Sequence, residues 1–123
     1  MKSLDCLDWR GTEPAGSLIE IFENRVNQHP NRLFIADMSI RLTWGEVAQA
    51  LRGFASTYGE QLRDKDVAMF MGNGAPFFIT YLSVLFCGGR VALLNAAMPR
   101  KSGALLMETL TPEVVFAADT LEF

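Results

Sequence analysis

The chain has 123 residues, of which half are hydrophobic and 20% are charged, and its formal net charge is −3. This length gives room for one domain with a modest core, and the composition is that of a globular protein and not of a disordered one. The cations form no basic patch of the kind that binds a phosphate backbone, so we expect no binding to nucleic acid.

The first elements are a leader and an amphipathic helix. Residues 1–16 have no periodicity and contain Gly11, Pro14 and Gly16, which predicts a leader or linker before a domain of residues 17–123. Ser17 and Glu20 have the spacing of a capping box. The apolar residues that follow recur at helical spacing until Pro30, which predicts a helix that ends near His29.

A small hairpin and the longest helix come next. Residues 33–37 and 40–42 favour short strands, which predicts a hairpin, although Met38-Ser39 is a weak turn dipeptide. Thr43 and Glu46 form a second capping box. The helix that they open is predicted to end near Gly59 and has one apolar stripe, made by Trp44, Val47, Ala48, Leu51, Ala55 and Tyr58.

The second half of the chain alternates strands and helices. The strands are expected at residues 66–71, 91–94 and 114–118; the first is apolar enough to be buried on both faces, and the second is also expected to be buried. The helices are expected at residues 77–87 and 99–110. This order predicts the α/β class: a small three-layer domain with a parallel sheet built from βαβαβ units, plus the N-terminal helix and hairpin.

The segment from Phe77 to Phe86 is apolar almost all round. Such a helix is normally buried on every side, and a sheet of three strands covers only one side. We therefore expect a larger protein or a partner around it, and self-association through this helix. The longest apolar run, Ala75 to Cys87, contains Pro76 and is too short to span a membrane.

The turn Gly72-Asn73-Gly74 stands between a strand and a helix, where backbone N–H groups can bind phosphate. A dinucleotide fingerprint would need glycine where Phe77 stands, and no Walker lysine is present. The sequence therefore favours a tight turn with Asn73 as the helix cap.

Other candidate groups have structural explanations. His29 is the only histidine, and it is expected on the surface at the end of a helix. Glu20 and Glu46 are assigned to capping boxes and not to acid–base chemistry. The two cysteines, Cys6 and Cys87, have no metal-like spacing, which is typical of a reduced cytoplasmic protein.

The order of the segments resembles a known family. The segments that carry the resemblance are Ser17 to Phe22, His29 to Arg32, Leu42 to Val47, Val67 to Gly74, Tyr81 to Gly89 and Val91 to Asn95. Together they resemble the N-terminal subdomain of the adenylate-forming superfamily, which contains acyl- and aryl-CoA synthetases, luciferases and the adenylation domains of peptide synthetases. The match runs from about Ser17 to Ala118. The positions that fit the family pattern as caps, turns and close-packing points are Thr43, Glu46, Asn73, Gly88 and Asn95.

The sequence also departs from the family pattern. Pro76 stands at a position that is usually acidic, Phe86-Cys87 replaces a typical Lys-Ala pair, and Leu93 replaces a usual proline. Met98-Pro99-Arg100 fits the family loop only loosely. These changes indicate a divergent branch and leave the substrate subclass open.

The resemblance implies that the chain is the N-terminal portion of an ATP-dependent acyl- or aryl-adenylate-forming ligase. The family uses ATP and magnesium, but the residues that it uses for catalysis lie downstream of the matched part, so we assign this chain no catalytic, cofactor-binding or metal-binding residue and expect no activity from it alone. The alternative is a free-standing, non-catalytic protein-interaction module derived from the family. The partner is then the remainder of a ligase or another protein. Whether Leu121-Glu122-Phe123 is native stays open.

Overall fold

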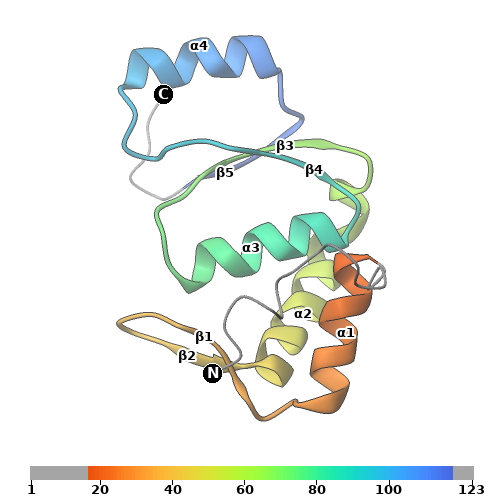
Figure 1. Ribbon diagram of the computed structural model, residues 1–123. Helices are drawn as coiled ribbons and strands as arrows, with labels where there is room; N and C mark the ends of the chain where they lie inside the picture. The colour runs from red at the N-terminus through yellow and green to blue at the C-terminus, as the bar shows by residue number, and fades with distance from the viewer. Residues whose placement is uncertain (1–16, 118–123) are drawn as a thin grey trace, which may run out of the picture.

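The computed structural model describes residues 17–117, so the predictions for the leader and for residues 118–123 lie outside the described residues. Within them the elements follow the predicted order (Figure 1). The elements are α1 (Leu18–Gln28), β1 (Leu33–Ala36), β2 (Arg41–Thr43), α2 (Trp44–Leu62), β3 (Asp66–Phe70), α3 (Ala75–Phe86), β4 (Arg90–Leu93), α4 (Arg100–Leu110) and β5 (Val114–Ala117).

The parallel sheet has the strand order β4-β3-β5, and both pairs of strands are parallel. Val67 of the central strand pairs with Val91 on one side and with Val114 on the other. Residues 67–70 are buried, as expected of a strand that is covered on both faces. Helix α3 lies on one face of the sheet and α4 on the other (Figure 1). The predicted three-layer α/β architecture is therefore confirmed.

The N-terminal half packs against the α3 side of the sheet. In α1 the Ser17 side chain accepts a hydrogen bond from the Glu20 N–H, so one half of the predicted capping box is present. Strands β1 and β2 form the predicted antiparallel hairpin, in which Ala36 pairs with Arg41. Among residues 17–117 no helix combines the length and the apolarity that crossing a membrane requires.

Helix α2 continues three residues beyond the predicted stop at Gly59. The extension has a physical reason, since it brings Leu62 into the core, where the side chain is 1% exposed. Burying a leucine outweighs the helix penalty of a single glycine, which is about 1 kcal/mol relative to alanine. Gly59 therefore does not end α2, although the periodicity predicted an end there.

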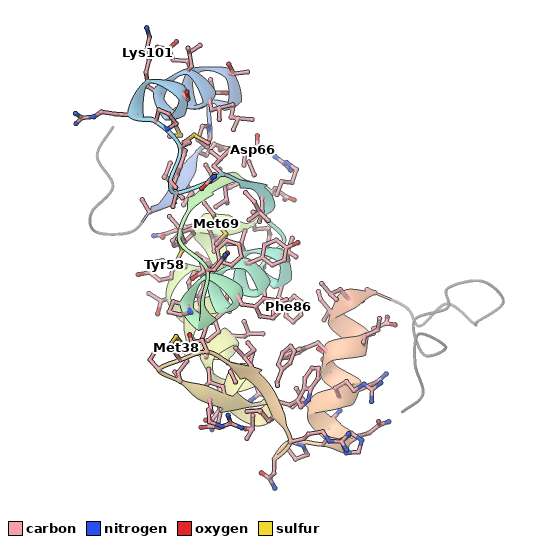
Figure 2. All side chains as sticks on the ribbon, turned by 60° about the vertical axis from the view of Figure 1, so that its left-hand side comes forward. Met38, Tyr58, Asp66, Met69, Phe86 and Lys101 are labelled. Carbon is pink, nitrogen blue, oxygen red and sulfur yellow. The ribbon has the colours of Figure 1, made fainter. Side chains whose placement is uncertain are left out.

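The chain itself covers α3 more completely than the sequence indicated. Phe86 contacts Phe22 of α1 with ring centroids 5.2 Å apart, and Figure 2 shows Phe86 on the side of α3 that faces α1. Phe78 meets Phe34 of the hairpin at 5.8 Å. Leu82 and Val84 are buried. The sheet covers one side of this helix, as expected, and α1, α2 and the hairpin cover much of the rest.

The apolar stripe of α2 is buried only in its first half. Trp44 stacks on Phe34 with ring centroids 3.7 Å apart, and Val47, Ala48 and Leu51 are buried. Tyr58 contacts Phe116 of β5 but stays 41% exposed. The second half of the stripe lies beside the edge of the sheet, so this chain leaves it partly uncovered.

Candidate functional site

In parallel α/β sheets, ligands bind beyond the carboxyl ends of the strands. At this edge, β3 ends at Phe70 and β4 at Leu93, and the loops that follow enclose a hollow of about 480 Å³. The residues that line it are Met71, Gly72, Asn73, Phe77, Leu93, Leu94, Asn95, Ala96 and Ala97. It is the candidate site because it combines the expected position in the fold with polar groups.

The chemistry of this hollow is limited. The fold brings together Asn73 and Asn95, two of the positions noted in the sequence. The Asn95 side-chain oxygen accepts a hydrogen bond from the Ala97 N–H at 2.9 Å, so part of its capacity serves its own loop. The lining residues include no carboxylate, imidazole, thiol or hydroxyl group. Amides do not titrate near neutral pH, so the hollow has no general acid, general base or nucleophile.

The start of α3 lies beside this hollow, and its cap differs from the prediction. The N-cap residue is Gly74, with φ +146°, and not Asn73. Glycine has no side chain with which to cap, and Asn73 stands one residue too early. The Asp37 carboxylate supplies the missing acceptor, because its Oδ2 accepts a hydrogen bond from the Ala75 N–H at 2.9 Å.

Asp37 is a positioning residue for which the sequence predicted no role. Its Oδ1 accepts hydrogen bonds from the N–H groups of Ser39 and Ile40, both at 2.8 Å, and from the Ser39 hydroxyl at 3.1 Å. Hydrogen bonds from backbone N–H groups, the Ala75 bond above all, lower the pKa of this carboxyl to about 2. An aspartate two residues before a serine in a hairpin turn is a recognisable Asx-turn signal. The bond to α3 spans 38 positions and has no local signal.

Thr43 and Glu46 form the complete capping box that the sequence predicts. The Thr43 hydroxyl accepts from the Glu46 N–H at 3.1 Å, and the Glu46 carboxylate accepts from the Thr43 N–H at 3.0 Å. Between them, the Gly45 N–H donates to the Pro30 carbonyl at 2.8 Å. A side chain at Gly45 would lie 3.0 Å from that oxygen. This segment therefore serves to seat the start of α2 on the turn after α1.

Gly88 stands at the opposite end of α3, away from the candidate site. Its φ of +87° lies in the region that favours glycine. Its carbonyl accepts a hydrogen bond from the Asp64 N–H at 3.0 Å, which joins the end of α3 to the turn after α2. Of the five family-pattern positions, only Asn73 and Asn95 line the hollow; the other three hold elements together.

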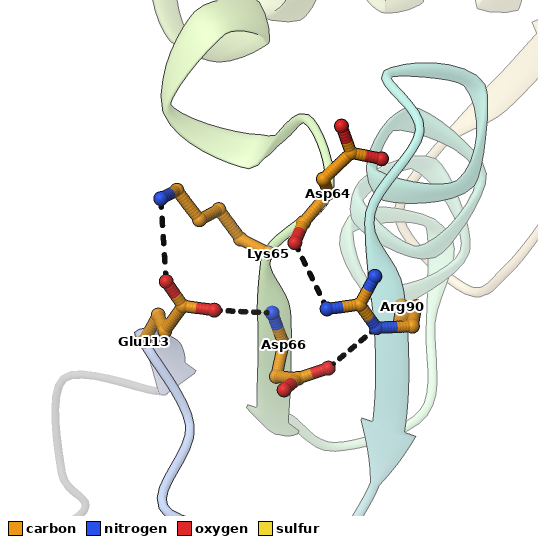
Figure 3. Close-up of polar contacts among 5 residues, drawn as sticks. All are labelled: Asp64, Lys65, Asp66, Arg90 and Glu113. Carbon is orange, nitrogen blue, oxygen red and sulfur yellow. Dashed lines mark hydrogen bonds and ion pairs between the residues drawn. The ribbon is translucent and has the colours of Figure 1, made fainter.

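A charged cluster lies at the amino edge of the sheet (Figure 3). Arg90 contacts the Asp66 carboxylate at 2.7 Å and donates to the Asp64 carbonyl at 2.9 Å. Lys65 lies 3.2 Å from the Glu113 carboxylate. Hydrogen bonding to Asp66 raises the pKa of Arg90, which stays charged. The ion pairs and hydrogen bonds of this cluster tie together the starts of the three strands, and its side chains are exposed.

The remaining titratable candidates do not form a site. His29 is the C-cap residue of α1, and its N–H donates to the Arg25 carbonyl. Cys87 is a free, half-buried thiol, and desolvation raises its pKa, which makes it a poor nucleophile. Cys6 lies outside the described residues. Across residues 17–117 no three histidine, cysteine or acidic residues are grouped as metal ligands would be.

Comparison with known proteins gives one family. The family model described as AMP-binding enzyme matches residues 22–122. No curated protein matches the sequence.

Several solved structures have the same fold as this chain. The Klebsiella oxytoca NpsA N-terminal subdomain is 15% identical with a TM-score of 0.78, over 86% of this chain and 28% of that one. The nonribosomal peptide synthetase FmoA3, in its alpha-methyl-L-serine-AMP bound form, is 24% identical with a TM-score of 0.76, over 88% of this chain and 13% of that one. E. coli MenE with bound OSB-AMS is 19% identical with a TM-score of 0.70, over 82% of this chain and 23% of that one. The chain thus spans less than a third of the length of each of these structures.

Proposed function

The chain belongs to the AMP-binding enzyme family, and we propose that it forms the N-terminal part of an ATP-dependent acyl- or aryl-adenylate-forming ligase. Its role there is that of a scaffold. It presents the carboxyl edge of a parallel sheet, with the loops that contain Asn73 and Asn95, to the remainder of the enzyme. The remainder supplies the groups that activate the carboxylic acid.

One observation carries the proposal. The family match covers residues 22–122, almost the whole chain, and yet the chain spans only 28% of the NpsA N-terminal subdomain. A chain that matches the family throughout but accounts for a fraction of its fold is best explained as one segment of the ligase. The described residues also offer no acid, base or nucleophile at the candidate site, which agrees with catalysis by groups elsewhere.

The exposed apolar residues support a partner around the sheet. Leu93 on the edge strand β4 is 50% exposed, Val115 on the other edge strand is 39% exposed, and Leu105 on α4 is 57% exposed. Parallel sheets are normally covered on both faces, and open edges invite pairing with another segment. We propose that the remainder of the ligase covers these residues.

ATP and magnesium belong to the complete ligase in this proposal. The described residues do not fit either group. No three potential ligands are grouped around a site for a metal ion, and no lysine or arginine lines the hollow at the carboxyl edge. Phosphoryl chemistry requires such charges around the transferring group.

We also propose a cytoplasmic location, which the unpatterned cysteines and an ATP-dependent reaction favour. Self-association of the chain stays a prediction. The exposed fractions of the apolar side chains favour the sheet edges over α3 as the surface of self-association. In α3, Phe78 is the one large apolar side chain with more than a third of its surface exposed.

The test is ATP–pyrophosphate exchange with magnesium and a panel of aryl, amino and fatty acids. The chain alone should give no exchange above the heat-denatured protein, and activity would contradict the proposal that the remainder holds the catalytic groups. The downstream reading frame separates the alternatives. A continuing frame, or an adjacent gene, that encodes a Gly/Ser/Thr-rich loop with lysine supports the ligase. The absence of both supports a non-catalytic interaction module.

A further inference from the structure

The turn between β3 and α3 has the layout of a phosphate site, since a glycine-containing loop leads from a buried strand into a helix. In such sites the N–H groups of the first helical turn point at the ligand, and the helix dipole favours negative charge. In this chain the corresponding N–H groups begin at Ala75, directly after Gly72-Asn73-Gly74.

That position is already filled by an anion from the chain itself. The Asp37 Oδ2 accepts the Ala75 N–H at 2.9 Å, and it would lie 3.4 Å from a Cβ on Gly74. The carboxylate therefore lies against the backbone where a phosphate oxygen would bind. A second anion at the same N–H would meet both a steric block and a like charge.

The carboxylate is also fixed in place from the other side. Its Oδ1 accepts three hydrogen bonds, from the N–H groups of Ser39 and Ile40 and from the Ser39 hydroxyl. These bonds set the orientation of the carboxylate within the hairpin turn. The two oxygens thus serve two different elements, the hairpin and α3. A movement of the hairpin relative to α3 would break the bond to Ala75.

We propose that Asp37 is a built-in anion that occupies the N-terminus of α3, keeps this strand–loop–helix turn from binding phosphate, and fixes the hairpin to the loop at the carboxyl edge of the sheet. Asp37 is a positioning residue, because it acts through the Ala75 backbone.

The first experiment is amide hydrogen exchange on Asp37→Asn. The asparagine keeps an acceptor for the hairpin turn, but its amide group carries no charge and loses one acceptor oxygen. We expect exchange at Ala75 to rise by about tenfold, whereas the Phe78 N–H, which donates to Gly74 within the helix, changes less. The control Ser39→Ala removes only the hydroxyl contact and should leave Ala75 unchanged. Equal exchange at Ala75 in the wild type and Asp37→Asn would overturn the proposal.

The second experiment is rescue by small anions. Asp37→Ala removes the internal carboxylate, so formate or phosphate should raise its melting temperature above that in chloride of equal ionic strength. The wild type and Ser39→Ala should show no such difference. If Asp37→Ala is unfolded in chloride, folding on addition of formate supports the proposal, and failure to fold counts against it. Phosphate that shifts the amide signals of residues 72–75 in the wild type would also overturn it.

Discussion

Two glycines show how strongly the surroundings of a residue decide whether it tolerates substitution by alanine. Gly53, in the middle of α2, has no heavy atom within 4 Å of an added Cβ. Gly89 is packed at the junction of α2 and α3, where an added Cβ would lie 2.8 Å from a Val84 methyl group and 3.0 Å from the Leu62 carbonyl oxygen. The same substitution should therefore have opposite effects at the two positions.

We expect Gly53→Ala to raise the free energy of unfolding by about 0.5–1 kcal/mol, because alanine favours helix and restricts the unfolded chain. Gly89→Ala should lower it by about 1–3 kcal/mol, because Val84 is fully buried and a backbone oxygen cannot move away. Urea unfolding monitored by circular dichroism measures both. Destabilisation by Gly53→Ala, or a neutral Gly89→Ala, would contradict the packing described here.

Asp37 should also give the protein a distinct pH dependence. Its pKa is lowered from 3.8 to about 2 in the folded state, so its contribution to stability is fully present above pH 4 and is lost as the pH falls through about 2. Asp37→Asn lacks this contribution at every pH. The gap in the free energy of unfolding between wild type and variant should therefore close between pH 4 and pH 2. A constant gap, in urea titrations at each pH, would show that the charged form is not preferred.

At the scale of elements, the caps explain where helices begin. The Thr43 box is complete, with Thr43 half-buried and Glu46 exposed, whereas Ser17 caps α1 at an exposed position and without the second hydrogen bond of a box. We expect Thr43→Ala to cost about 1–2 kcal/mol and Ser17→Ala about 0.5–1 kcal/mol. Urea unfolding measures both values. A larger loss from Ser17→Ala would indicate that α1, and not the start of α2, limits the stability of the N-terminal half.

Local patterns predicted the elements well where the signal was local. The Thr43 capping box, the Ser17 cap, the hairpin and the βαβαβ order can each be read from a few neighbouring residues. Non-local contacts decided the rest. Leu62 extends α2 past Gly59 because a distant core receives it, and Asp37 caps α3 from 38 positions away, so Asn73 is not needed. The hollow at the carboxyl edge follows from the strand order, but its lack of ionisable groups does not.

At the scale of the whole molecule, two buried apolar clusters stabilise the chain, and other apolar residues lie outside them. Leu62 is 1% exposed and Leu105 is 57% exposed, so the same substitution tests both environments. Leu62→Ala should lower the free energy of unfolding by about 2–5 kcal/mol, a large part of the total for a small domain. Leu105→Ala should change it by less than about 0.5 kcal/mol. Equal losses in urea unfolding would mean that α4 is packed more tightly than described.

The open edges of the sheet lead to the last prediction. Leu93 and Val115 expose apolar surface on the two edge strands, which are where separate chains pair, and lysine is the residue that natural edge strands use against such pairing. We expect the wild type to self-associate at high concentration and Leu93→Lys with Val115→Lys to stay monomeric. Phe78→Ala, on α3, should behave as the wild type does. Light scattering over a concentration series distinguishes these cases: a wild-type monomer at every concentration contradicts self-association, and dissociation by Phe78→Ala alone would assign it to α3.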